Sequence, residues 1–180
     1  QECERALQTM SPGCFFAGLE AVGALIVLFG EARVDVARMT ALLQATSAQE
    51  SAQRLAFALE GQADAAAALQ QRLPLPNTAR RWLAWVQAFA PTLRQWHSAD
   101  GEARWQVFKA TDSLRGQGEI VALAQGLGEA QALVDICARL PRLQALAPAS
   151  FLAQGLQGAA LGEALRAAQI ALLGEMDERG

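Results

Sequence analysis

The sequence predicts an all-α protein, built as a bundle or array of about nine to eleven short helices. Ala and Leu dominate the composition, Tyr is absent and β-branched residues are few, a mix that favours helices because it costs little side-chain entropy. Hydrophobic residues make up 52% of the 180 residues, enough for a core. Apolar residues also recur at helical spacing in segments that Gly and Pro separate.

The first 31 residues predict two short helices that meet at Ser11-Pro12, where a serine can cap and a proline can open a first turn. After Gly23, residues 24–29 are apolar on every side, which predicts a buried turn or short helix that ends at Gly30. The chain opens inside an amphipathic helix without an initiator Met. We therefore expect it to be a piece of a longer protein.

Four helices are expected over the next sixty residues. One carries Val36 and Met39, and the next follows a capping box of Ser47 and Glu50 and stops at Gly61. An Ala-rich helix over residues 63–73 ends at Leu-Pro-Leu-Pro. Residues 77–89 form the fourth, with two tryptophans and a kink or break at Pro91.

Glycines and prolines also separate the remaining helices. We expect a helix that carries Trp105, Val107 and Phe108, then helices over 120–127 and 130–140, separated by glycines. Pro141 and Pro148 bracket the next connection. The last helix begins near Gly158. Its expected core stripe is formed by four apolar residues at helical spacing, Leu161, Leu165, Leu172 and Met176.

Composition excludes several function classes. The formal charge of −3 provides no general attraction for nucleic acid, so a contact with RNA must be local and none with DNA is expected. The three cysteines form no CxxC pair, which argues against a zinc site or disulfide framework and fits a cytoplasmic protein. The longest apolar run is about half a membrane span, so no membrane contact is expected.

His97 is the only histidine, so a metallohydrolase or a serine or cysteine hydrolase would have to work through it alone. It lies in a polar stretch and is interpreted as a surface or helix-end residue. The short-spaced carboxylates, such as Asp100 and Glu102, have no strand or phosphate loop beside them and are interpreted as surface charge. We therefore predict no catalytic residue, metal ligand or cofactor in this chain.

Several arginines are placed where they could meet phosphate. Arg80 and Arg81 precede Trp82 and Trp85, an arrangement that could stack unpaired bases, although the apolar pattern favours core packing of the rings. At the end of a helix, arginines stabilise the dipole and could equally bind phosphate. The tentative RNA-binding set is Arg80, Arg81, Arg115, Arg139, Arg142, Gly158, Gly162 and Arg166. The two glycines are included because a helix start without side chains leaves N–H groups open to phosphate, close helix packing being the alternative.

Four segments together resemble the region that follows the catalytic head in bacterial CCA-adding enzymes, the tRNA nucleotidyltransferase and poly(A) polymerase family. Residues 1–31 are similar to the family's neck, with Gly30 in place of the usual Pro. Residues 72–77 resemble its Arg-Leu-x-Val-Pro-x-Glu step, residues 112–115 its Asp-Ala-x-Arg segment, and residues 155–173 its tail helix. All four occur in the family's order.

The resemblance also indicates that the histidines of a phosphohydrolase module are missing from this chain. Some members carry a His-Asp phosphohydrolase module, with a first His after the neck and a His-Asp pair after an Arg-Phe-Ala-x-Leu helix. Residues 54–59 resemble that helix but run into Glu60-Gly61, and the first-His region, residues 34–39, has no histidine. Phosphohydrolase activity is therefore expected to be absent.

The resemblance implies three parts: neck helices at 1–31, a degenerate body at 32–97 and a tail at 98–180, forming one continuous helical unit. The implied role is to bind the acceptor stem and elbow of tRNA in the cytoplasm for a catalytic head, absent here, that uses Mg²⁺ with CTP and ATP. The tRNA or poly(A) specificity of that head is left open. The alternative is an all-helical module that binds a partner chain or forms a homodimer. An apolar surface patch without arginine would favour this alternative, whereas arginines gathered on one concave face would favour RNA.

Overall fold

The computed structural model describes residues 2–9, 11–48, 50–115, 118–146 and 148–175. These residues form helices and connections and no strand, so the all-α fold is confirmed. The chain divides into two compact units, residues 1–90 with 125–128 and residues 91–124 with 129–180. The first unit therefore contains the expected neck at 1–31 and residues 32–90 of the expected body, whose last residues, 91–97, belong to the second unit.

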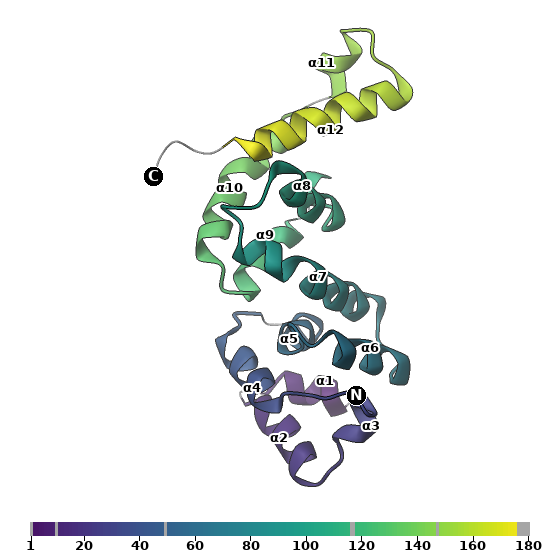
Figure 1. Cartoon of the computed structure of the whole chain (residues 1–180), viewed down its shortest axis with the longest axis vertical. Helices are drawn as coiled ribbons and strands as arrows, with labels where there is room; N and C mark the ends of the chain where they lie inside the picture. The colour runs from purple at the N-terminus through teal and green to yellow at the C-terminus, as the bar shows by residue number, and fades with distance from the viewer. Residues whose placement is uncertain (1, 10, 49, 116–117, 147, 176–180) are drawn as a thin grey trace. The chain divides into compact units, whose positions relative to one another are not determined.

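The first unit contains α1 (Glu2–Leu7), α2 (Gly13–Ala21), α3 (Leu25–Phe29), α4 (Val36–Ala45), α5 (Ser51–Ala58), α6 (Ala63–Arg72) and most of α7 (Asn77–Arg94). Helix α4 packs on both α2 and α5, α1 packs on α5, and α3 packs on α6 (Figure 1). The core gathers Leu7, Phe16, Met39, Phe57 and Leu83, each almost completely buried. The two N-terminal helices thus belong to the same core as the helices that follow them.

The second unit contains α8 (Gly101–Ala110), a 3-10 turn η1 (Ser113–Arg115), most of α9 (Glu119–Gly126), α10 (Ala130–Gln144), α11 (Pro148–Leu152) and α12 (Gly158–Gly174). Helix α12 packs on α8, α10 and α11 (Figure 1). Its crossing with α8 is close, because a Cβ added to Gly101 would overlap the carbonyl oxygen of Ile170. A glycine is therefore required where the two helices meet.

Local chemistry sets several helix ends, among which only the stop at Gly61 was expected from the sequence. Asp35 and Asp100 cap α4 and α8, their carboxylates accepting from the N–H groups of Arg38 and Ala103 at 2.9 and 2.7 Å. Gly61 follows α5 with a φ of +71°, a conformation that glycine adopts without steric cost. Short-range backbone chemistry was enough to place these ends.

Three local expectations were wrong at helix ends. The capping box fails because α5 begins after Glu50 with no side-chain cap, while the Ser47 hydroxyl donates to the carbonyl of Gln125. Helix α10 does not end at residue 140 but continues through Pro141 to Gln144. Helix α7 contains Pro91 within its bounds, so of the kink or break expected there the break is wrong. Packing along the helix compensates for the one donor that each proline removes.

Two expectations of burial were also wrong. Residues 24–29 do form a short helix, but only Phe29 is buried, and Ile26 and Val27 are 57% and 66% exposed. In α12 the fully buried residues are Gln169 and Leu173, not the expected leucine stripe, whose last member, Met176, lies outside the described residues. The helical period was right in both segments, but the partner elements cover a different face.

Candidate functional site

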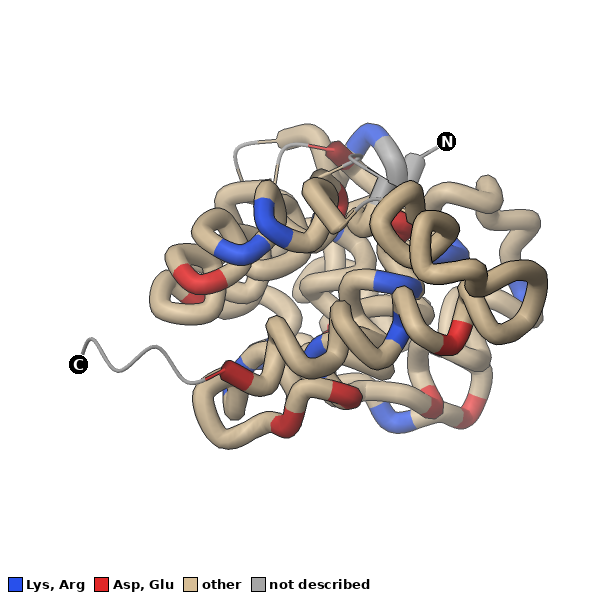
Figure 2. The backbone as a smooth tube through the Cα atoms, turned by 90° about the horizontal axis from the view of Figure 1, so that it is seen from above, with Lys and Arg blue, Asp and Glu red and all other residues tan. Residues whose placement is uncertain are grey.

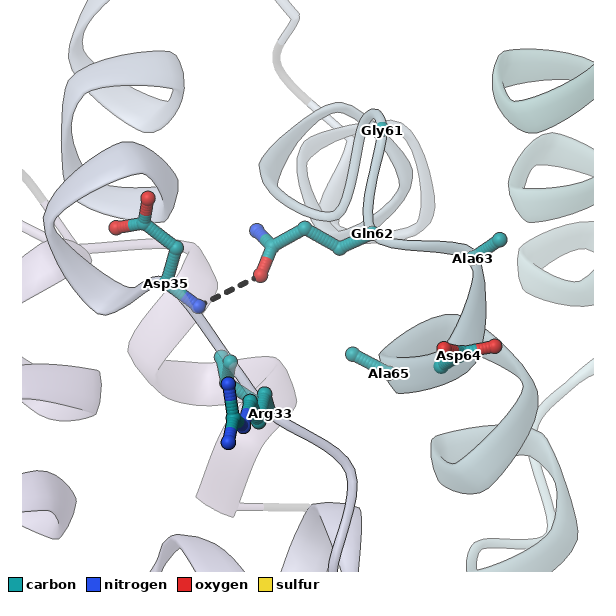
Figure 3. A pocket seen from close by; sticks show the side chains of 8 residues that line it. Arg33, Asp35, Gly61, Gln62, Ala63, Asp64 and Ala65 are labelled. Carbon is teal, nitrogen blue, oxygen red and sulfur yellow. Dashed lines mark hydrogen bonds between the residues drawn. The ribbon is translucent and has the colours of Figure 1, made fainter.

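A pocket of about 500 Å³ lies in the first unit, between the residues that precede α4 and the start of α6 (Figure 3). The backbone N–H of Asp35 donates to Oε1 of Gln62 at 2.8 Å across it. One turn away, Nε of Arg38 donates to the carbonyl of Glu60 at 3.2 Å. These two bonds join segments 22 and 27 residues apart and fix the pocket's walls.

The polar lining of the pocket comes from Arg33, Asp35, Gln62 and Asp64. Figure 3 shows the Asp35 carboxylate turned away from Gln62, in the direction of α4, where it caps the helix. Among the described residues, no three histidine, cysteine, aspartate or glutamate side chains are grouped so that they could hold a metal ion. The charged side chains are exposed, so the pocket is polar and open to water.

Arg38 occupies the space beside Gly61. A Cβ added to Gly61 would lie 3.1 Å from Nη2 of Arg38, and the preceding Glu60 is 5% exposed. A guanidinium at this position repels a divalent cation. The local chemistry is thus that of a structural contact between two loops.

The tryptophans of α7 are core residues, as their apolar pattern favoured. Trp82 and Trp85 are 2% and 7% exposed and pack edge to face, with ring centroids 5.3 Å apart. Phe57 extends the cluster at 5.9 Å from Trp82. Rings buried in this way are unavailable for stacking on unpaired bases.

Arg80 and Arg81 lie on the exposed side of α7. The guanidinium of Arg81 stands 4.9 Å from the Trp85 ring centroid, an attraction that holds its planar group along the helix surface. The two side chains thereby form an adjacent pair of cations in the first unit. No other member of the tentative set belongs to this unit.

In the second unit, Arg139 must be removed from the set. Its side chain is 3% exposed, its Nε pairs with Oδ1 of Asp135 at 2.6 Å, and its Nη1 donates to the carbonyl of Leu172 at 2.7 Å. Asp135 also accepts from the indole N–H of Trp96 at 2.7 Å. Arg139 therefore fastens α10 to the end of α12, and its guanidinium does not face solvent.

Arg142 and Arg166 are exposed and engaged with carboxylates. Arg142 pairs with Glu175 at 2.9 Å and Arg166 with Glu102 at 2.7 Å, all four side chains being 41–56% exposed. Hydrogen bonds from Arg166 and Gln106 lower the pKa of Glu102 below its usual value. The side chain of Arg115 lies outside the described residues.

Trp105 carries two cations on its ring, an arrangement that sequence inspection missed. The Lys109 ammonium and the Arg166 guanidinium each lie 4.8 Å from the ring centroid. The ring is 6% exposed and donates to Oε1 of Gln169 at 2.9 Å. The i, i+4 spacing of Trp105 and Lys109 was the available signal, whereas Arg166 reaches the ring only through the packing of α12 on α8.

Gly158 and Gly162 are exposed, and an added Cβ at either would meet no atom within 4 Å. The alternative explanation of close helix packing is therefore wrong for the described residues. Gly158 begins α12 with a φ of +56°, so the backbone conformation itself favours glycine there. Gly162 has no such requirement.

Charges of both signs are interspersed along the chain (Figure 2). The first unit carries seven arginines and eight acidic residues, so its formal charge is −1. The second unit carries the other eight cations and ten acids, which gives −2. Neither unit has the basic excess typical of a nucleic-acid-binding domain, so any RNA contact depends on local groups of arginines.

No helix among the described residues combines the length and apolarity needed to cross a membrane. No protein-family model, curated protein or solved structure matches the chain.

Proposed function

We propose that this chain is the RNA-binding helical support of a CCA-adding tRNA nucleotidyltransferase and that it acts in the cytoplasm. In this proposal it binds the acceptor stem and elbow of tRNA and holds the 3′ end toward a catalytic head. The head, which is not in this chain, uses Mg²⁺ with CTP and ATP. The chain by itself adds no nucleotide.

The observation that carries the proposal is the meeting of residues 34–39 with Glu60, Gly61 and the adjacent Gln62. The resemblance assigns residues 34–39 to the first-His region of a phosphohydrolase site and Glu60-Gly61 to the place of its His-Asp pair. The bonds from Arg38 to Glu60 and from Asp35 to Gln62 bring them together around one pocket. This contact is what we expect of a family body whose second active site has been lost, and it is the basis of the proposal.

The RNA contacts in the proposal come from exposed arginines in each unit, Arg80 with Arg81 and Arg142 with Arg166. Arginine suits this role because its planar fork binds phosphate oxygens through two hydrogen bonds. The carboxylate partners of Arg142 and Arg166 are exposed, and exposed pairs are worth only about 0–1 kcal/mol. Exchanging such a pair for a phosphate contact therefore costs little.

The test is binding of tRNA that lacks its CCA end, followed by fluorescence anisotropy between 50 and 200 mM salt. We expect affinity to fall steeply with salt, because each phosphate contact releases counterions and contributes about −0.9 to the log–log slope. The double variant Arg80→Ala/Arg81→Ala should reduce the magnitude of that slope by about 2. Arg94→Ala, which removes an exposed arginine outside the set, is the matched control. Absence of binding at 50 mM salt, or equal slopes for both variants, would refute the proposal.

A second candidate function is a protein-interaction module, favoured by one specific observation. Val22, at the end of α2, and Ile26 and Val27, within α3, are 76%, 57% and 66% exposed. Large exposed apolar side chains close together in sequence are consistent with a contact surface. Analytical ultracentrifugation of the chain and of Val27→Asp separates the candidates, since a self-association that the aspartate abolishes would support an interface.

A further inference from the structure

A second cavity, of about 280 Å³, lies inside the first unit. Its inner walls are formed by buried side chains of five helices, α1, α2, α5, α6 and α7: Leu7, Phe16, Leu55, Leu69 and Ala79 are each at most 8% exposed. Its mouth lies at Ser51, Ala52 and the loop 73–76. The cavity is therefore a hollow with buried inner walls that is partly open to solvent at its mouth.

The lining is apolar. None of the described residues around the cavity is charged, and the only side-chain hydroxyl among them belongs to Ser51. A buried water needs two to four polar partners, and these walls offer too few to fill the cavity with water. An ionic ligand would likewise lose its hydration without gaining a partner.

The loop at the mouth adds no free backbone donor. Leu73 N–H donates to the carbonyl of Leu69 at 2.9 Å and Leu75 N–H to the carbonyl of Leu73 at 2.8 Å. Pro74 and Pro76 have no N–H to satisfy. Every donor of the loop is therefore paired or missing, so an apolar molecule can lie against it without leaving an N–H group unsatisfied.

We propose that this cavity is a binding site for a small uncharged apolar molecule, a single ring or a short alkyl chain. The walls exclude charge, and the volume sets the size, because an apolar cavity of about 150 Å³ already holds benzene. The site is separate from the polar pocket at Gln62 and from the arginines of the proposed RNA surface. The test of this site is therefore independent of the proposed function, and failure of one proposal would not contradict the other.

Benzene is the probe, titrated into the whole chain and followed by calorimetry and by ¹³C-methyl NMR. We expect saturable binding of one molecule, with shifts of the methyl resonances of Leu7, Leu55 and Leu69. Ala52→Leu extends a side chain from the wall into the cavity and should weaken binding at least tenfold. Ala67→Leu, the same change at an exposed position of α6, should leave the Kd within twofold.

Three outcomes would overturn the proposal. They are no saturable binding to the unmodified chain, equal weakening by Ala52→Leu and Ala67→Leu, and a dimer that Ala52→Leu converts to monomer, which would mean that a second copy fills the cavity. If Ala52→Leu does not fold, Ala52→Val, which adds less volume at the same position, takes its place with the same criteria. Hexane, which shares the apolar chemistry but not the ring, should compete with benzene.

Discussion

Replacing Arg104 by leucine would remove one donor group from three backbone carbonyls. The Arg104 side chain is 4% exposed, and its guanidinium donates to the carbonyls of Trp96 at 2.9 Å, of His97 at 3.1 Å and of Leu173. It thereby joins the turn after α7 to the last turn of α12. Burial lowers the pKa of this guanidinium, and Asp135 opposes the shift, but an arginine remains charged at neutral pH.

The expected loss follows from the bonds removed. Hydrogen bonds from a charged group contribute about 1.5–3 kcal/mol each, and carbonyls left without a donor in the interior add a penalty. Burial of the apolar leucine side chain offsets part of the lost stability. The unfavourable desolvation of the guanidinium is also removed. We expect the free energy of unfolding of the second unit to fall by about 3–5 kcal/mol.

Urea unfolding, read through circular dichroism, measures this change, and amide hydrogen exchange along α12 locates it. Arg94→Leu is the control, because the Arg94 side chain is 45% exposed and lies 3.8 Å from its partner Glu129. It should change stability by less than about 1 kcal/mol. Arg104→Lys keeps the positive charge but not the planar guanidinium, so its loss of stability should lie between those of Arg104→Leu and Arg94→Leu. If Arg104→Leu were within 1 kcal/mol of Arg94→Leu, or if exchange at the end of α12 were unchanged, the role assigned to Arg104 would be refuted.

Two further predictions concern a pair of glycines and a carboxylate. Gly126→Ala should destabilise the first unit by about 1–3 kcal/mol in urea unfolding, because the added Cβ would overlap the ring of Phe57. Gly162→Ala, made in open space within α12, should stabilise its helix by about 0.5–1 kcal/mol, and the reverse order would contradict the packing. By NMR titration, Glu102 should titrate below the usual range for glutamate, since Arg166 stabilises its charged form. Arg166→Gln should move that pKa upward; the stability contributed by the pair should be present at neutral pH and lost as pH falls through the pKa of the folded state.

Much of the secondary structure could be predicted from the sequence, because helix ends depend on chemistry within one turn. Gly61 was correctly expected to stop a helix, whereas the caps at Asp35 and Asp100 follow the same local chemistry but were found only in the structure. Pro141 misled the prediction, since a proline removes only one donor and the rest of α10 packs well enough to continue. The helices were therefore found more reliably than their ends.

The candidate sites were less accessible to sequence reasoning. The resemblance singled out residues 34–39 and Glu60-Gly61 as places where histidines are missing, and the bonds of Asp35 and Arg38 that join this region were found only in the structure. The apolar cavity had no sequence signal, because helices α1, α2, α5, α6 and α7 each contribute only a few side chains to its wall. A cavity depends on how several helices pack against one another, and local sequence does not specify that packing.

The sequence by itself determined that this chain is helical, where most helices lie and which rings are buried, because these follow from local spacing and composition. Only the tertiary structure decided what each arginine does. Arg139 and Arg142 stand three residues apart, yet one is buried against Asp135 and the other is exposed. The difference arises because Arg139 donates to the carbonyl of Leu172 in the packed contact between α10 and α12, whereas Arg142 pairs with the exposed Glu175 just beyond the end of α12.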